Sequence, residues 1–213
     1  MLLAVILSVI PFFALTELQA IVITEIHYHS GPEDPDEALE FVEIYNEGSV
    51  VADISGYLFS TGIQFVFPEE TFLAAGDYFV VCRNEDAMRL LHGIDNTVGN
   101  FVGRLDNGGE TIQLVTPTGS PIAEVDYDDR GLWPAVSDGT GYTLSIRSPL
   151  SNPKGPDHWQ RSARPGGTPG ANESRRVFPS GNPPRLPVET SRTNFTHRRV
   201  SKKFAGCIEG SRP

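Results

Sequence analysis

The sequence has few of the residues that hold small exported proteins together. Only two cysteines occur among 213 residues, Cys82 in an apolar stretch and Cys207 in a polar one. No framework of disulfides can therefore replace a hydrophobic core. Stability must come from buried apolar side chains, and we expect Cys82 to be a small buried hydrophobe rather than a reactive thiol.

Familiar catalytic patterns are also absent from the sequence. The patterns G-x-S-x-G and H-E-x-x-H, the Walker loop and the dinucleotide-binding loop do not occur. Catalysis by two neighbouring carboxylates would need Glu40 and Glu43 on one side of a strand, whereas alternation sends them to opposite faces. The sequence therefore predicts a protein that is not an enzyme.

A single long apolar run occurs, from Leu2 to Leu15, and Pro11 interrupts it. It is shorter than the roughly 20 apolar residues that a membrane-spanning helix needs. An apolar N-terminal run that ends near a small residue, here Ala20, is typical of a secretory signal peptide. We predict that residues 1–20 are a cleaved signal peptide and that the mature chain, without a transmembrane span, is secreted or lies in the cell envelope. The alternatives are an uncleaved anchor or a wrongly assigned start of the sequence.

Positive charge is scarce in the body of the sequence and concentrated after it. Up to Glu173 there are 25 acidic and 8 basic side chains, whereas residues 174–213 hold 9 basic and 2 acidic ones. The acidic body disfavours nucleic acid and anionic membranes, which the basic segment could bind. That segment is rich in Gly, Pro, Ser and Arg, so we predict that residues 171–213 form a basic tail or linker, disordered beyond about Ser174.

Short apolar stretches alternate with turn residues through the body, which is typical of β-sheet proteins. The dipeptide Thr61-Gly62 predicts a hairpin tip, and Asn84 is expected to cap one short helix over residues 85–91. The sequence therefore predicts an all-β antiparallel sandwich with one short helix. Its strands are expected at residues 21–28, 40–46, 54–60, 63–67, 78–82, 110–115, 122–127 and 142–146.

Several segments, in a fixed order, resemble the lamin tail domain family. They are Glu25–Tyr28, Glu40–Asn46, Ile54–Tyr57, Phe67-Pro68 and Leu73–Tyr78. Five later segments look like the bacterial secreted branch: Leu105–Glu110, Val125–Asp129, Trp133-Pro134, Asp138–Gly141 and Gly166–Gly170. The resemblance implies that residues 21–170 form an immunoglobulin-like β-sandwich domain with no shared catalytic residues.

The same resemblance implies an exported interaction or adhesion module that binds an extracellular or cell-surface protein or polysaccharide. Relatives also occur beside hydrolase, nuclease or spore-coat-type kinase domains. The alternative is therefore that the chain is the N-terminal targeting module of a split or truncated multidomain protein that carries such a kinase or hydrolase domain. Binding of nucleic acid is expected only through the basic tail.

Two acidic segments are candidate metal sites. The carboxylates of Asp126, Asp128 and Asp129 are hard oxygen donors of the kind that Ca²⁺ prefers, although they do not fit the calcium-loop pattern. His27 and His29 share a face at i, i+2 spacing and could form a metal pair with acids of residues 33–37, or they could lie beside a solvated acidic loop. We predict that the protein has no cofactor, with calcium as the alternative.

Three aromatic residues near the acidic turn are candidate binding residues. Tyr127, Trp133 and Trp159 offer large rigid surfaces with a polar group, which suits a recognition patch. The alternative is that they seal one end of the sandwich core, because loop aromatics commonly do so.

Overall fold

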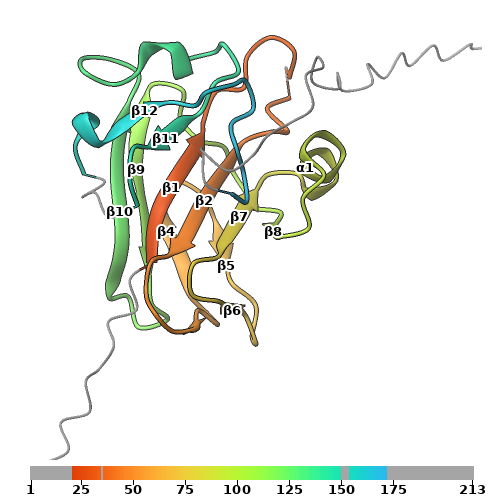
Figure 1. Cartoon of the computed structure of the whole chain (residues 1–213), viewed down its shortest axis with the longest axis vertical. Coiled ribbons are helices and arrows are strands. Elements are labelled where there is room, and N and C mark those ends of the chain that lie inside the picture. The colour runs from red at the N-terminus through yellow and green to blue at the C-terminus, as the bar shows by residue number, and fades with distance from the viewer. Residues whose placement is uncertain (1–20, 35, 150–153, 172–213) are drawn as a thin grey trace, which may run out of the picture.

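A computed structural model describes residues 21–34, 36–149 and 154–171 of the chain. Within these residues, a six-stranded and a four-stranded sheet pack against each other, a two-stranded ribbon lies at one end, and one α-helix lies beside the larger sheet (Figure 1). The predicted all-β sandwich with one short helix is confirmed. The predicted signal peptide and most of the predicted tail lie outside the described residues and stay predictions.

The larger sheet has the strand order β12-β11-β1-β2-β7-β8. All its neighbours are antiparallel except β7 and β8, which run parallel. The strands β8 and β12 were not among those expected, because each has three residues and no alternating pattern. The bounds are β1 (Ile21–His27), β2 (Phe41–Asn46), β7 (Tyr78–Cys82), β8 (Thr97–Gly99), β11 (Leu144–Ile146) and β12 (Trp159–Arg161).

The smaller sheet has the order β10-β9-β4-β5 and consists of two hairpins placed side by side. Gly62 turns the first hairpin with φ +83°, and a Cβ there would lie 3.1 Å from Ile112 Cγ1, so both the turn and the packing favour glycine. The hairpin predicted at Thr61-Gly62 is thus confirmed. The strands are β4 (Leu58–Thr61), β5 (Phe65–Val66), β9 (Gly109–Val115) and β10 (Pro121–Asp128); the separate ribbon pairs β3 (Ala52–Asp53) with β6 (Phe72–Leu73).

The main hydrophobic core lies between the two sheets, and a bulge in β1 shapes it. Ile23 and Ile26 both reach this core although strict alternation would separate them, because the register of β1 against β2 shifts between Ile23 and Glu25. The extra residue is Thr24, so Thr24 and Glu25 both turn to the opposite side of the sheet, which we call its outer face.

A second, smaller core lies on the outer face, where α1 (Glu85–His92) packs on β2 and β7. Asn84 caps this helix as predicted, since its Oδ1 accepts a hydrogen bond from the Ala87 N–H at 3.0 Å. Cys82 is buried in this core and burial raises its pKa to about 12, which confirms that it acts as a small hydrophobe. Among the described residues, no helix is long and apolar enough to cross a membrane.

Candidate interaction surface

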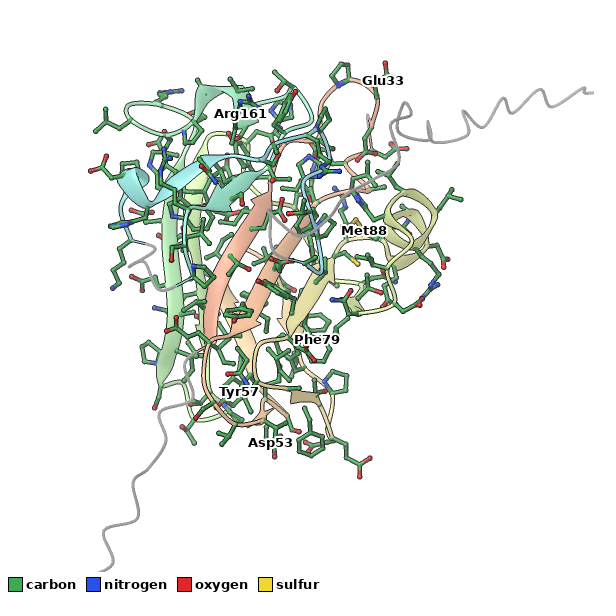
Figure 2. All side chains as sticks on the ribbon, in the orientation of Figure 1. Glu33, Asp53, Tyr57, Phe79, Met88 and Arg161 are labelled. Carbon is green, nitrogen blue, oxygen red and sulfur yellow. The ribbon has the colours of Figure 1, made fainter. Side chains whose placement is uncertain are left out.

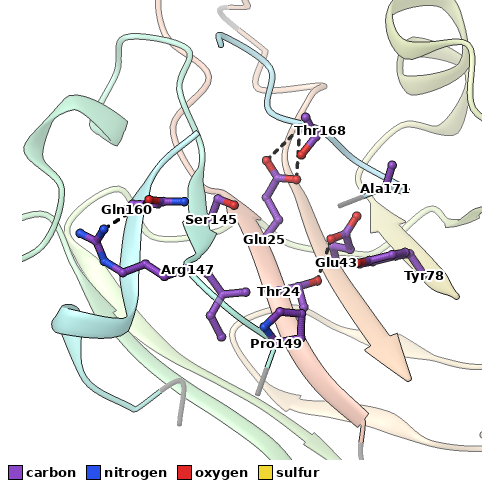
Figure 3. Close-up of a pocket in the computed structure, with 11 residues that line it drawn as sticks. Thr24, Glu25, Glu43, Tyr78, Ser145, Arg147, Pro149, Gln160, Thr168 and Ala171 are labelled. Carbon is purple, nitrogen blue, oxygen red and sulfur yellow. Dashed lines mark hydrogen bonds between the residues drawn. The ribbon is translucent and has the colours of Figure 1, made fainter. Parts of the chain in front are cut away.

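The bulge in β1 places two buried carboxylates opposite each other on the outer face. Glu25 on β1 pairs in register with Glu43 on β2, and the two residues are 1% and 2% exposed. Figure 3 shows their side chains side by side, with Thr24 donating from Oγ1 to Glu43 Oε1 at 2.7 Å. Two carboxylates buried this closely need hydrogen-bond donors, because an unpaired buried charge is very costly.

The donors come from the segment of residues 165–171, which we call the strap. The Thr168 N–H donates to both carboxylate oxygens of Glu25, at 3.1 and 3.2 Å, and the Gly170 N–H donates to Glu43 Oε2 at 2.6 Å. Thr143 Oγ1 also donates to Glu25 Oε1. The two carboxylates therefore fix the strap across the outer face, and charge-assisted bonds of this kind are stronger than neutral ones.

Glycine is required where the strap crosses Glu25. Gly167 has φ +68°, and a Cβ there would lie 1.8 Å from Glu25 Oε1. Any other residue would displace the carboxylate and strain the backbone. The glycine-rich segment of residues 166–170 therefore lets the backbone approach and bind the two carboxylates.

A hollow of about 230 Å³ lies beside these carboxylates. The residues that line it include neither histidine nor cysteine, and the two carboxylates already bind the strap. The arrangement holds a polypeptide segment of the chain itself. The lining residues are Thr24, Glu25, Glu43, Tyr78, Ser145, Ile146, Arg147, Pro149, Gln160, Thr168 and Ala171.

The three candidate calcium ligands have separate partners in the structure. Asp126 Oδ1 accepts from Thr111 Oγ1 at 2.8 Å, Asp128 Oδ1 accepts from the Arg130 N–H at 2.9 Å, and Asp129 forms an ion pair with the Arg130 side chain. In the part of the chain that the structure describes, no three His, Cys, Asp or Glu residues lie together as a metal site. Calcium binding by these residues stays a prediction.

The three candidate aromatic residues belong to the main core. Tyr127 and Trp159 are 2% and 1% exposed, and Trp133 packs on Trp159 with ring centroids 6.1 Å apart. Tyr127 donates its hydroxyl to the Asp106 carbonyl at 2.8 Å, and burial raises its pKa far above the ordinary value. Of the three, only Trp133 keeps some exposed surface, so the packing agrees with the alternative that they seal the core.

The two histidines likewise have different partners. His27 is buried, its Nδ1–H donates to the Leu39 carbonyl at 3.0 Å, and burial lowers its pKa to about 4. His29 Nδ1 lies 2.6 Å from Asp138 Oδ1. Each ring is thus held by a neighbour from another segment, and the structure does not bring them together as a metal pair.

Glu40 and Glu43 do not form a catalytic pair either. Glu40 is fully buried and accepts from Arg83 and from the Leu105 N–H, both at 3.4 Å, whereas Glu43 binds Thr24 and Gly170. Burial raises the pKa of Glu40 to about 7, against the opposing effects of those two donors. The prediction that the two side chains point to opposite faces agrees with these separate partners.

Three large apolar side chains are exposed together at the end of the sandwich that carries β3 and β6. They are Val50, Val51 and Phe72, with 42%, 56% and 54% of their surface exposed, and we call them the Phe72 surface. Pairing of β3 with β6 places Asp53 opposite Phe72, on the face away from the core residues Ala52 and Leu73. Figure 2 marks this end of the molecule by the label Asp53.

An open hollow of about 310 Å³ adjoins the Phe72 surface. Two acidic residues lie at this hollow or next to it. Asp77 lines it, Asp53 pairs with Phe72, and hydrogen bonds from Ser55 hold the pKa of Asp53 below its ordinary value. Apolar surface with a negative rim fits a partner that is both apolar and basic. The lining residues are Phe72, Leu73, Ala74, Asp77, Tyr78, Phe79, Asn96 and Gly170.

Comparison with known families identifies the sandwich. Residues 16–129 match the family described as Lamin Tail Domain, which is more than half of the chain. The chain belongs to the lamin tail domain family. This confirms the family that the sequence resembles, and it makes the sandwich an immunoglobulin-like one. No curated protein matches the chain.

Lamin tail domains are non-catalytic and often mediate protein interactions. The matched part of this lamin tail domain contains the strands from β1 to β10 and the whole Phe72 surface. The strands β11 and β12 and the strap follow it in the chain. The docking of the strap on Glu25 and Glu43 therefore joins the matched part of the domain to residues beyond it.

Sequence analysis did not identify the strap contacts or the Phe72 surface. Glu25 interrupts an apolar strand, Glu43 lies between apolar neighbours, and a glycine-rich motif occurs far downstream. Together these three features are a signal for buried carboxylates that bind backbone N–H groups. For Phe72 no such signal exists, because an apolar residue in a predicted sandwich is expected to be buried.

Proposed function

We propose that this lamin tail domain is an exported, non-enzymatic interaction module of the bacterial secreted branch, and that it binds an extracellular or cell-surface partner through the Phe72 surface. The observation that carries the proposal is the joint exposure of Val50, Val51 and Phe72 at one end of the sandwich. Contiguous apolar residues with a polar rim mark interaction sites on soluble proteins. The chemistry favours a protein partner, because polysaccharides offer little apolar surface.

Three further features support the proposal. The apolar run from Leu2 to Leu15 is typical of an export signal. The acidic body disfavours polyanions as partners, since residues 21–171 hold 23 acidic and 8 basic side chains. The glycine-rich segment of residues 166–170, one of the five segments on which the likeness to the secreted branch rests, docks on Glu25 and Glu43.

A second candidate function is that of a targeting module in a multidomain protein with a kinase-like or hydrolase domain. The composition of residues 174–213, rich in Gly, Pro, Ser and Arg, favours it because such segments commonly link domains. Both candidates use the sandwich to bind and differ in what is attached to it. A partner domain encoded directly downstream would favour the second.

The test is binding of the purified chain to washed envelope of the producing cell, measured by co-sedimentation. The variants are Phe72→Ser and, as the control, Val66→Ser, because Val66 is 60% exposed but lies on β5 of the other sheet. We expect Phe72→Ser to weaken binding about tenfold, as for a contact residue worth about 1.4 kcal/mol. Equal binding by both variants would refute the assignment of the Phe72 surface.

A further inference from the structure

We propose that residues 175–178 of this chain, Arg175-Arg176-Val177-Phe178, dock in the hollow beside the Phe72 surface and cover it. The proposal rests on the proposed function, because the covered surface is the one assigned to the partner. The basic tail would then compete with the partner for the Phe72 surface.

The position at which the strap ends is the first argument. Gly170 itself lines the hollow, and its N–H is held by Glu43 at 2.6 Å. The next residue, Ala171, lies with Tyr78 in the lining of the adjoining hollow. An extended chain spans at most about 3.5 Å per residue, so residues 175–178 lie within roughly 17 to 28 Å of Gly170 along the chain. The described chain therefore ends beside the hollow that we assign to the tail.

The second argument is that the segment and the hollow are chemically complementary. The hollow offers the apolar surfaces of Phe72, Leu73 and Phe79 together with the carboxylate of Asp77, and Asp53 lies opposite Phe72. The segment brings two guanidinium groups followed by valine and phenylalanine. Guanidinium groups bind carboxylates through two parallel hydrogen bonds and stack on aromatic rings, while the apolar pair can cover the exposed ring of Phe72.

The third argument is concentration, which favours this segment over any free molecule. A binding segment on a short flexible linker has an effective concentration in the millimolar range. A contact with a dissociation constant of only about 0.1 mM would then be docked about ten times more often than it is free. The excess of acidic side chains in the body adds attraction for the tail at low ionic strength.

Limited trypsin digestion of the purified chain, followed by mass spectrometry, tests the docking. Trypsin cleaves after Arg176 and after Arg192, and only the first bond lies in the proposed docked segment. The intrinsic ratio of the two rates is taken from a free peptide of residues 172–196. In the whole chain, we expect the rate of cleavage after Arg176, divided by the rate after Arg192, to be about tenfold lower than in the free peptide. The reason is that proteolysis follows the population of the open form.

Variants and dilution complete the experiment. Phe72→Ser should remove the protection of the Arg176 bond, and Val66→Ser should retain it. Protection that disappears on dilution would assign the hollow to the tail of a second copy and would overturn docking within one chain. The proposal would be overturned if the cleavage ratio equalled that of the free peptide. It would also be overturned if the Arg176 bond stayed protected in the Phe72→Ser variant.

Deletion of residues 174–213 separates this proposal from the proposed function. If the tail competes with the partner, the shortened chain should bind cell envelope about tenfold more tightly than the whole chain. Unchanged envelope binding on deletion would refute the competition. A third outcome is that Phe72→Ser leaves envelope binding unchanged but removes the protection of the Arg176 bond. That result would refute the partner site and support the docking.

Discussion

Glu25 and Glu43 face each other across neighbouring strands, and both carboxylates accept hydrogen bonds from backbone N–H groups of the strap. The pair exists because a bulge turns Thr24 and Glu25 to the same side of β1. A one-residue irregularity thereby converts part of an apolar strand into a binding site for another segment of the chain. The stability of the sandwich should therefore depend on the strap as well as on the core.

Substitution of Gly167 by alanine should destabilise the domain more than a matched substitution elsewhere. The new Cβ would lie 1.8 Å from Glu25 Oε1. Gly76→Ala is the control, because Gly76 has a similar positive φ of +78° but no atom within 4 Å of the added Cβ. We expect about 1 kcal/mol of backbone strain for both and a further loss of about 2 kcal/mol for Gly167→Ala, measured by urea unfolding. Equal losses would show that the carboxylate moves aside freely.

Replacement of Glu25 by glutamine should loosen the strap. An amide offers one acceptor oxygen in place of two, and its NH₂ group would oppose the Thr168 N–H, which donates to both oxygens of Glu25. We expect a loss of about 1–3 kcal/mol, with faster hydrogen exchange at the Thr168 amide than in the native chain. The exposed Glu69→Gln is the control and should change neither quantity. Unchanged exchange at Thr168 in the Glu25 variant would contradict the role of this carboxylate.

Stability should fall between about pH 4.5 and pH 7 through Glu40. Burial raises the pKa of Glu40 from 4.5 to about 7, so over this interval the folded state holds a proton that the unfolded state has lost. The stabilising contribution is complete below pH 4.5 and is lost as the pH rises to 7. His27 acts in the opposite direction, because its pKa is lowered from 6.5 to about 4 and its contribution is lost as the pH falls through that interval.

The variant Glu40→Gln separates these two effects. Without the titration of Glu40, the free energy of unfolding should rise more steeply from pH 4 to 6.5, because the opposing slope due to Glu40 is removed and that due to His27 stays. Denaturant midpoints measured at several pH values provide the check. Parallel pH profiles for the variant and the native chain would mean that Glu40 does not titrate in this range.

Cys82 should resist thiol reagents as long as the domain is folded. Its thiol is buried under α1, and burial raises its pKa to about 12, so almost none is present as the reactive thiolate. In a Cys207→Ser variant, which leaves Cys82 as the only thiol, we expect no labelling by a disulfide reagent before unfolding and complete labelling in denaturant. Rapid labelling of the native protein would show that the second core opens readily.

Local features of the fold could be predicted from the sequence, whereas the candidate sites could not. Alternating residues predicted β2, a continuous apolar run predicted β7, and Asn84 marked the start of α1, because these signals act over a few neighbours. The bulge at Thr24 and the contact of Glu25 with Thr168 depend on strand pairing and on residues 143 positions apart. The burial of Tyr127 and Trp159 likewise depends on which loops fold back over the core.

The strap also bears on when this domain can mature during synthesis. Until Gly170 has been made, Glu25 and Glu43 lack two of their backbone donors, and the outer face is left open to water. Contacts between such distant positions form late, because a long loop must close first. The nascent lamin tail domain thus stays short of its final stability until almost the whole of residues 21–171 has been synthesised.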